Sequence, residues 1–366
     1  MKVLVMTRLP EVDASSRQRV YQYKEILEKK HGIYLTIVPF YSKEIFLKYR
    51  QGKLSKLKLA QLLLNRKKEL KQFENFDMVW ILRSLSPLEN PSFLKKITRK
   101  NIPIIFEMDD AIYLGEKANR LRTKLTRSWN HVEKYISNAN AVIVGNTELE
   151  AWSLQYNKHA FVIPTGLDVA SYKLKTTDDS DLFTIGWIGS ESTAPNLDLV
   201  IPAINKFAKD KKIRVIFIGL GNYSTKLKFN DNIEFINLEW SEEIQHNYLQ
   251  KFDIGIAPLY NTPFNRGKCA YKVIQYMATG IPTVASPVGV QTELFSSKEI
   301  GFNAESEEEW IRIFDLLLND KKLRLKLGRN SRKIAENTFD VDILANKIAG
   351  VLYTIFEEKD KMDENT

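Results

Sequence analysis

The sequence alternates short, continuously apolar runs with longer stretches of helical character, and it does so twice. The first half contains VLVMT, YLTIVPF, DMVWIL, IPIIFEM, AVIVGN and FVIPT, and the second half contains FTIGWIG, IRVIFIG, IEFINL, DIGIAPL and IPTVAS. Helical stretches such as SSRQRVYQYKEILEKKHG, which ends in glycine, lie between these runs. Uninterrupted apolar runs are typical of strands buried on both faces of a parallel sheet. The pattern therefore predicts an α/β fold with two Rossmann-like, doubly wound domains.

The length of the chain also favours two domains, because 366 residues exceed what one ordinary core holds. A polar segment rich in Asp, Thr and Lys, Ala170–Phe183, is the predicted break. We expect an N-terminal domain over residues 1–170 and a C-terminal domain over residues 171–340. Residues 341–366 are expected to form an amphipathic crossover helix that returns to the N-terminal domain and ends in a charged tail.

The composition disfavours several classes of protein. The single cysteine, Cys269, cannot form an intrachain disulfide, which fits a reducing cytoplasm. The four histidines are scattered without metal-ligand spacing, so no metal site is expected. No stretch approaches the roughly 20 apolar residues that span a bilayer. The opening MKVLVMTRLP is too short an apolar run for a signal peptide. We therefore expect a cytoplasmic protein that is soluble or peripheral to the inner face of the plasma membrane.

The net charge of +9 favours anionic partners. No nucleic-acid recognition motif is present, so phosphorylated small molecules are preferred over nucleic acid. The stretch Lys53–Lys71, KLSKLKLAQLLLNRKKELK, places leucines among many lysines. A basic amphipathic helix of this kind can lie on an anionic membrane surface. The alternative is a helix of the N-terminal domain with a leucine core face and a solvated basic face.

The stretch Arg266–Gly289, RGKCAYKVIQYMATGIPTVASPVG, predicts a helix that begins near Ala270 and stops at Gly280. Lys272 and Gln275 share one face of this helix. A lysine in the first turn opposes the helix dipole unless an anion binds at that end. Lys272 is therefore a candidate ligand for a diphosphate, and a solvated lysine on a surface helix is the alternative.

Two glycine turns follow predicted strands in the second half. The run IGWIGSES contains Gly189 and Ser190, and FIGLGN ends in a similar turn. Together with the helix described above, these turns would face one crevice at the carboxyl ends of the strands, where such sheets bind nucleotides. Neither a Gly-Lys-Ser/Thr phosphate loop nor the three-glycine dinucleotide motif is present, so NTP hydrolysis and NAD chemistry are disfavoured.

Two charged groups follow predicted strands in the first half. DASSRQR places Arg17 and Arg19 at the expected start of a helix, which suits phosphate or acceptor binding; arginines exposed beyond an N-cap serine are the alternative. IIFEMDDAIY places Glu107, Asp109 and Asp110 at a strand end. Adjacent carboxylates are costly unless they are solvated, paired or functional. We favour acceptor binding or catalysis over metal binding for this group.

These motifs resemble those of GT-B fold glycosyltransferases, and specifically of glycosyltransferase family 4, the group 1 transferases. TIGWIGSESTAPNL, FDIGIAPL and KCAYKVIQYMATGIPTVASPVGV have the order and spacing found in that family. SSRQRVYQY, FEMDDAIY and VIVGNTELEAW followed by VIPTGLD resemble one bacterial branch. The resemblance covers nearly the whole chain, about residues 2–355.

The resemblance implies transfer of a hexosyl group from a nucleotide-diphosphate sugar to a saccharide or polyprenyl-linked acceptor in bacterial surface polysaccharide biosynthesis. Such enzymes retain the anomeric configuration and need neither a metal nor another cofactor. They bind the donor mainly on the C-terminal domain and the acceptor mainly on the N-terminal domain. A donor phosphate oxygen takes the acceptor proton.

At the level of residues, the resemblance implies that Lys272 faces the diphosphate and that Gln275 reaches the ribose. Leu238 and Trp240 would lie by the base. Asp109 and Asp110 are the catalytic candidates in the N-terminal domain.

The sequence departs from the family pattern at several positions. The family motif has two glutamates separated by seven residues, and these positions hold Gly267 and Gln275 here. The backbone from Gly267 to Cys269, or Lys268, would have to replace the first glutamate. An Arg and Lys pair after the first C-terminal strand is missing, and Asp109 stands where a histidine is often found. The missing glutamates keep open the alternative of a non-catalytic nucleotide-sugar-binding subunit. Among enzymes, the alternative is a GT-B nucleotide-sugar epimerase.

Overall fold

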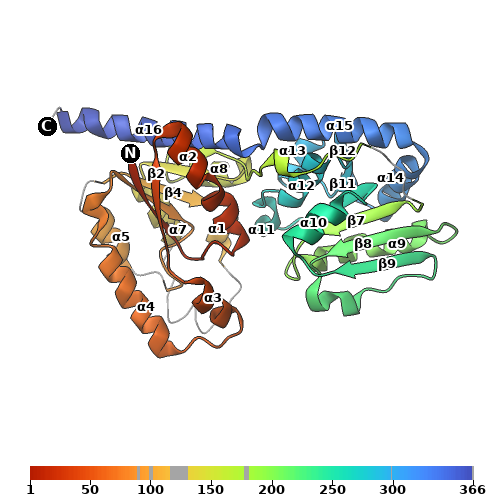
Figure 1. The fold of residues 1–366 in the computed structure, drawn as a ribbon, viewed down its shortest axis with the longest axis horizontal. Coiled ribbons are helices and arrows are strands. Elements are labelled where there is room, and N and C mark those ends of the chain that lie inside the picture. Colours follow the sequence, from red (N-terminus) through yellow and green to blue (C-terminus); the bar gives the residue numbers. More distant parts are fainter. Residues whose placement is uncertain (89–90, 99–101, 116–130, 177–180, 298, 365–366) are drawn as a thin grey trace. The chain divides into compact units, whose positions relative to one another are not determined.

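The computed structural model describes residues 1–88, 91–98, 102–115, 131–176, 181–297 and 299–364. The chain forms two compact units (Figure 1). The first unit comprises Met1–Gly166, Gly267–Cys269 and Val341–Thr366, and the second comprises Leu167–Arg266 and Ala270–Asp340. The chain thus passes to the second unit shortly before the polar segment at 170–183, of which residues 177–180 lie outside the described part.

The first unit is built on a six-stranded parallel sheet with the strand order β2-β1-β3-β4-β5-β6. Every residue of the three strands β3, β4 and β5 is buried. Their side chains alternate between two helix layers, which explains the continuous apolar runs in the sequence. The strands are β1 (Lys2–Thr7), β2 (Tyr34–Pro39), β3 (Met78–Leu82), β4 (Ile104–Met108), β5 (Ala141–Val144) and β6 (Ala160–Val162).

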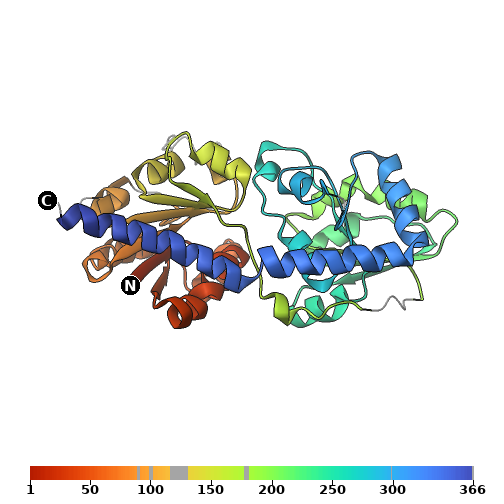
Figure 2. The same ribbon diagram turned by 90° about the horizontal axis from the view of Figure 1, so that it is seen from above.

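Helices cover both faces of this first sheet. One face packs against α2 (Lys24–His31) and α16 (Val341–Glu364), and Figure 2 shows α16 lying along it. The predicted return of the last helix to the N-terminal domain is therefore confirmed. The opposite face is covered by α5 (Pro91–Thr98), α7 (His131–Asn138) and α8 (Thr147–Ser153).

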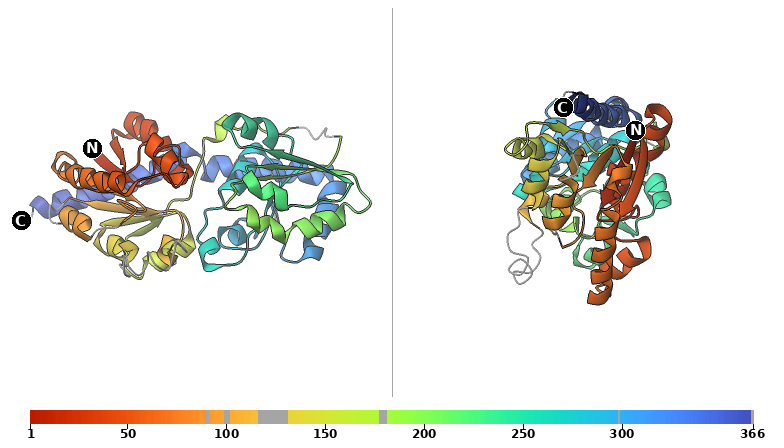
Figure 3. Two further views of the ribbon diagram at one scale, coloured as in Figure 1. Left: turned by 90° about the horizontal axis from the view of Figure 1, so that it is seen from below. Right: turned by 90° about the vertical axis from the view of Figure 1, so that its left-hand side faces the viewer.

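Two further helices, α3 (Lys43–Arg50) and α4 (Lys56–Glu69), pack on each other through Phe46 and Leu62. Figure 3 shows α4 on the outside of the first unit with α3 beside it. No helix of the described residues combines the length and the apolar character that crossing a bilayer requires.

The second unit contains another six-stranded parallel sheet, with the order β12-β11-β10-β7-β8-β9. Counted from the first strand of this unit and read from β9 to β12, that order is 3-2-1-4-5-6 of the Rossmann fold. All eleven predicted strands are present, and the predicted α/β fold class is confirmed. The strands are β7 (Thr184–Ile188), β8 (Ile213–Ile218), β9 (Ile233–Leu238), β10 (Ile254–Ala257), β11 (Thr283–Ala285) and β12 (Gly301–Asn303).

Helices also cover both faces of the second sheet. One face packs against α9 (Ile201–Phe207) and α14 (Glu307–Asn319). The other packs against α10 (Glu242–Leu249), α12 (Tyr271–Thr279) and the C-terminal part of α15 (Lys321–Thr338). Two short helices complete the unit, α11 (Pro263–Arg266) and α13 (Val290–Leu294).

Candidate functional site

Each sheet has one topological switch point, where successive connections depart in opposite directions. It lies between β1 and β3 in the first sheet and between β7 and β10 in the second. Open parallel sheets bind ligands beside the carboxyl ends of strands at such points. A predicted site residue that follows one of these strands is therefore in a position to contact a ligand.

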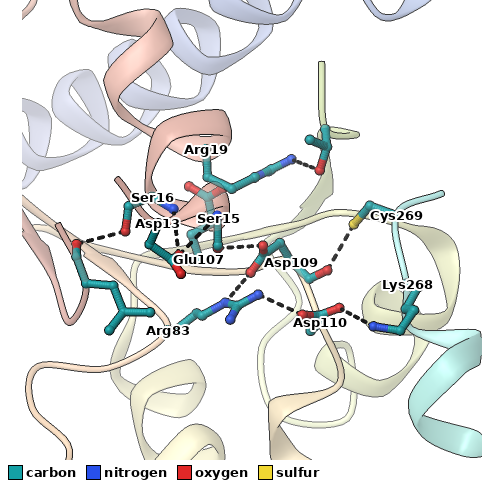
Figure 4. A network of polar contacts seen from close by, with 12 residues as sticks. Asp13, Ser15, Ser16, Arg19, Arg83, Glu107, Asp109, Asp110, Lys268 and Cys269 are labelled. Carbon is teal, nitrogen blue, oxygen red and sulfur yellow. Dashed lines mark hydrogen bonds and ion pairs between the residues drawn. The ribbon is translucent and has the colours of Figure 1, made fainter. Parts of the chain in front are cut away.

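In the first unit, one arginine holds both predicted catalytic aspartates (Figure 4). Asp109 and Asp110 directly follow β4, and Arg83 directly follows β3. The Arg83 Nε donates to Asp109 Oδ1, and its Nη2 donates to Asp110 Oδ2 at 2.7 Å. The Asp109 and Asp110 side chains are 11% and 24% exposed, so solvent reaches both of them only in part.

The segment after β1 reaches the same carboxylate. The Ser15 hydroxyl donates to Asp109 Oδ2 at 2.6 Å. Asp13 is the N-cap of the short helix α1 (Ala14–Arg19), and its carboxylate accepts from the backbone N–H groups of Ser15 and Ser16. Asp109 is thus tied to the segments that follow β1 and β3, the two strands at the switch point.

Two residues from the second half of the sequence belong to this cluster. Gly267–Cys269 packs within the first unit. The Cys269 thiol donates to the backbone oxygen of Asp109 at 3.0 Å, and Lys268 Nζ lies 3.8 Å from Asp110 Oδ1. The Asn146 side chain donates to the Lys268 backbone oxygen at 3.3 Å. Lys268, predicted as a donor ligand, is therefore placed beside Asp110.

Gly267 is buried where no side chain fits. A Cβ built on it would lie 2.8 Å from the Cβ of Ala111 and 3.1 Å from the Cδ2 of Leu149, much closer than normal contact. The glutamate of the family motif could not be accommodated in this backbone position. That the backbone of Gly267 contacts the donor sugar stays a prediction.

The two aspartates differ in their acidity. Burial raises the pKa of Asp109, but the Arg83 guanidinium and the Ser15 hydroxyl outweigh it and hold that pKa below its ordinary value. Burial, and then the neighbouring Asp109 charge, raise the pKa of Asp110 against the opposing effects of Arg83 and Lys268. Asp109 is therefore the member of the pair that stays ionised, and Asp110 takes up a proton more readily.

Arg83 and Ser15 were not selected from the sequence. Arg83 has φ 62°, in the left-handed region that costs a non-glycine residue about 1–2 kcal/mol. A lone arginine directly after a continuously apolar strand is the one local signal that could have drawn attention to it. Its pairing with the aspartates requires knowledge that β3 and β4 are neighbours.

The prediction that Arg19 binds phosphate or acceptor is wrong. Its side chain is buried and its Nε pairs with Glu107, which is equally buried inside β4. A further N–H of Arg19 donates to the Ile163 backbone oxygen at 2.9 Å, and the Trp80 indole donates to Glu107 at 2.8 Å. Burial raises the pKa of Glu107, and Arg19 opposes that shift. The pair belongs to the core of the first unit.

Arg17 was expected at the start of a helix, but α1 is only six residues long and Arg17 lies in its last turn. Its side chain is half-buried. The predicted role of Arg17 in phosphate or acceptor binding stays a prediction.

In the second unit, α12 begins as predicted. Its N-cap is Ala270, with a left-handed φ of 52° and no side-chain hydrogen bond to the helix start. Lys272 stands in the first turn, where its Nζ lies 5.7 Å from the centroid of the Trp187 ring. Every residue of α12 from the third onward is buried, so the alternative of a surface helix is wrong. The lysine therefore lies beside a helix terminus that has no side-chain cap.

Gln275 is also buried. Its amide donates to the Tyr172 hydroxyl at 3.3 Å, and the Gln245 amide donates to the same oxygen at 2.8 Å. Only 4% of Gln275 is exposed. Its predicted contact with a ribose stays a prediction.

The other predicted donor residues come together at the ends of neighbouring strands. Gly219 follows β8 with φ 87°, and a Cβ there would collide with the backbone oxygen of Gly189, which follows β7. Ser190, next in the chain, is exposed. The Gly219 N–H donates to the backbone oxygen of Leu238, the last residue of β9, at 2.9 Å. Trp240 follows with 46% of its surface exposed.

No three His, Cys, Asp or Glu side chains come together to hold a metal ion within the residues that the structure describes. The independence from metal that the family resemblance implies stays a prediction.

Known proteins resemble this chain in part of its sequence and in its fold. Residues 168–334 match the family model of group 1 glycosyl transferases. An uncharacterized glycosyltransferase of Haemophilus influenzae is 26% identical over 190 residues, which cover 49% of this chain and 51% of that relative. The match thus spans about half the length of the curated relative.

Two solved structures cover nearly the whole chain. HepE from Anabaena in complex with UDP and glucose is 16% identical, with a TM-score of 0.69 and coverage of 97% of this chain and 100% of that one. Sucrose-phosphate synthase from Thermosynechococcus elongatus is 15% identical, with a TM-score of 0.72 and coverage of 98% and 99%. These likenesses show the fold, the two-sheet α/β architecture of GT-B glycosyltransferases.

Proposed function

We propose that this protein is a retaining, metal-independent glycosyltransferase. It moves a hexosyl group from a nucleotide-diphosphate sugar to a saccharide or polyprenyl-linked acceptor in bacterial surface polysaccharide synthesis. The observation that carries the proposal is the start of α12, where Lys272 stands beside an uncapped helix terminus within residues 168–334 that match group 1 glycosyl transferases. HepE, which shares the fold, was solved with UDP and glucose, so UDP-sugars are the first donors to test.

The start of α12 suits a diphosphate for two electrostatic reasons. No side-chain hydrogen bond caps the start of this helix, and the helix dipole is positive at this end. Lys272 adds a full positive charge to the same turn. The glycine turns at Gly189 and Gly219 bring two backbone segments close together at neighbouring strand ends with no side chain between them, a second feature suited to a nucleotide.

In the first unit, the turn that contains Asp109 and Asp110 suits a hydroxyl acceptor. Asp109 stays ionised, and each oxygen of a carboxylate can accept more than one hydrogen bond. A sugar hydroxyl could therefore donate to Asp109 in addition to the groups already bound. In the transfer, the acceptor oxygen bonds to the anomeric carbon as the bond to the diphosphate breaks. The acceptor proton passes to a phosphate oxygen of the leaving nucleoside diphosphate, and Asp109 orients the hydroxyl.

The exposed face of α4 favours a membrane-bound acceptor. Leu57 and Leu64 are seven residues apart, so they share one side of the helix, and they are 85% and 61% exposed. Leu62 is buried against α3 instead, so the helix has both a core face and an unpartnered apolar one. A shallow hollow beside Leu64 is lined by three lysines, Lys67, Lys68 and Lys71, together with Gln61 and Asn65. Exposed leucines with lysines beside them are suited to binding an anionic lipid surface.

Transfer is tested by incubating the protein with a panel of UDP-sugars and other nucleotide sugars, with and without saccharide and polyprenyl-phosphate acceptors. We expect release of the nucleoside diphosphate that depends on acceptor, and a product whose anomeric configuration, read by NMR, matches the donor. Binding without turnover would instead identify a non-catalytic subunit. A nucleotide sugar isomerised at one carbon would identify an epimerase.

Membrane binding is tested by flotation with vesicles that contain or lack anionic lipid. We expect the wild-type protein to float with the anionic vesicles, and Leu57→Ser/Leu64→Ser to float several-fold less. The matched control is Lys209→Gln/Lys212→Gln, which removes two exposed charges of the second unit. Equal flotation of wild type with both vesicle types would favour a soluble acceptor.

A further inference from the structure

We propose that Arg83 is a positioning residue of the acceptor site: its guanidinium fixes the orientation of the Asp109 carboxylate toward the acceptor hydroxyl. This inference rests on the proposed transferase function. It assigns to Arg83 a role that acts through Asp109 rather than through direct contact with the sugar.

The backbone of Arg83 is the first observation. Among the described residues, Arg83 and Ala270 are the only residues other than glycine with positive φ. The Arg83 N–H donates to the backbone oxygen of Glu107 at 2.8 Å, which extends the pairing of β3 with β4 by one residue before the chain turns. Glycine would adopt this conformation without strain. An arginine in its place suggests that the side chain compensates for the strained backbone.

The geometry of the guanidinium is the second observation. Arg83 donates through Nε to Asp109 and through Nη2 to Asp110, so one planar group joins two consecutive carboxylates (Figure 4). Lysine could not reproduce this contact, because an ammonium group has no planar fork. The Arg83 side chain is only 20% exposed, so its charge is partly shielded from water.

The remaining partners of the Asp109 and Asp110 carboxylates contact the oxygens that Arg83 does not bind. Ser15 donates to Oδ2 of Asp109, so that both of its oxygens are oriented, each by one donor. Lys268 lies near Oδ1 of Asp110, on the oxygen that Arg83 does not bind. Three segments of the chain therefore contact Asp109 and Asp110, and Arg83 is the residue among them that binds both aspartates.

The surrounding charges leave Arg83 without a substitute. Among the residues that the structure describes, the charged and titratable groups that act most strongly on Arg83 and the two aspartates are Arg19 and Glu107 from the adjoining core, Asp13 before α1, Lys268, and Cys269. Arg19 and Glu107 neutralise each other. Burial raises the pKa of the Cys269 thiol to about 12, so it carries no charge near neutral pH. Without Arg83, Lys268 would be the one remaining cation of this set against Asp13, Asp109 and Asp110.

The experiment compares Arg83→Gly, Arg83→Gln and Arg83→Lys with the matched control Arg50→Gln, an exposed arginine at the end of α3 in the same unit. Arg83→Gly suits the left-handed backbone and leaves space for free guanidinium ion. We expect kcat to fall at least about 100-fold in Arg83→Gly and Arg83→Gln. The affinity for the nucleoside diphosphate should change less than about twofold, since Lys272 and the glycine turns lie in the other unit. Millimolar guanidinium should restore activity to Arg83→Gly at least tenfold, and Arg83→Lys should stay impaired.

A measurement independent of activity separates this inference from the proposed function. Carbon-13 NMR of aspartate-labelled protein follows the titration of the Asp109 carboxyl group in wild type and in Arg83→Gly. We expect the pKa of Asp109 to rise in the variant and to fall again when guanidinium is added. Absence of transfer by wild type with every donor would overturn the proposed function, while the NMR titration still tests the contact. A folded Arg83→Gly or Arg83→Gln with wild-type kcat, or no rescue by guanidinium, would overturn the inference.

Discussion

The two units carry different chemical groups at the carboxyl ends of their strands. In the first unit, charged and hydroxyl side chains follow β1, β3 and β4, and Ser15 and Arg83 both donate to Asp109. In the second unit, the ends of β7 and β8 carry Gly189 and Gly219 in close approach. The same architecture therefore offers side-chain acceptors in one unit and closely approaching glycine backbone in the other.

This difference fits two kinds of ligand. Oriented carboxylates recognise donors of hydrogen bonds such as sugar hydroxyls, whereas backbone N–H groups and a helix terminus recognise anions such as a diphosphate. The first kind of site fails when a charge is removed, and the second when a positive charge is lost or a side chain fills the turn.

The largest effect should come from the buried charge pair of the first unit. Arg19→Met should lower the free energy of unfolding by about 3–5 kcal/mol, because Glu107 would remain as an unpaired buried charge. The double variant Arg19→Met/Glu107→Met should recover much of this loss, since apolar replacements of a buried pair are often tolerated. Urea denaturation measures both variants. An Arg19→Met protein as stable as wild type would contradict the structural role of the pair.

Removing the charge of Asp109 should slow transfer with little effect on the donor. Asp109→Asn keeps the shape of the side chain but weakens its hydrogen bond to an acceptor hydroxyl, so kcat should fall by about 10²–10³-fold. The affinity for the nucleoside diphosphate, measured by calorimetry, should stay within about twofold. Normal turnover by Asp109→Asn would leave Asp109 with a purely structural role.

Removing the charge of Lys272 should instead weaken the binding of the donor. Lys272→Ala should weaken binding of the nucleoside diphosphate by about 1.5–3 kcal/mol, the scale of a charge-assisted hydrogen bond. This corresponds to about 10–150-fold in the dissociation constant. Lys209→Ala, an exposed lysine of the same unit, is the matched control. Unchanged affinity in calorimetry would remove Lys272 from the donor site.

The smallest effect is expected from a chelator. If the helix terminus and Lys272 supply the positive charge for the diphosphate, EDTA should leave the transfer rate within about twofold of the untreated enzyme. The control is a second sample with added manganese, which should not increase the rate. Abolition by EDTA with recovery in manganese would show that a metal ion supplies that charge instead.

Apolar patterning was sufficient to predict eleven strands and the fold class, because burial on both faces of a sheet demands apolar residues at every position of a strand. The sequence also predicted where α12 starts and ends, since Gly280 and the following proline stop a helix locally. β12 was missed because its three residues, Gly301–Asn303, contain a single large apolar side chain, that of Phe302. The stretch after β1 was expected to be one helix, but it breaks at Val20, whose side chain is fully buried.

Tertiary structure alone decided which charged side chains meet. Asp109 is 94 residues from Ser15 and 160 residues from Cys269 in the chain, yet it hydrogen-bonds to both. Arg17 and Arg19 look equivalent in the sequence, but Arg19 points into the core toward a glutamate 88 residues away. Local patterns fix backbone conformation and burial, which depend on neighbours a few residues apart. The partners of a charge depend on strand order, which brings distant segments to one sheet edge and leaves no trace in local periodicity.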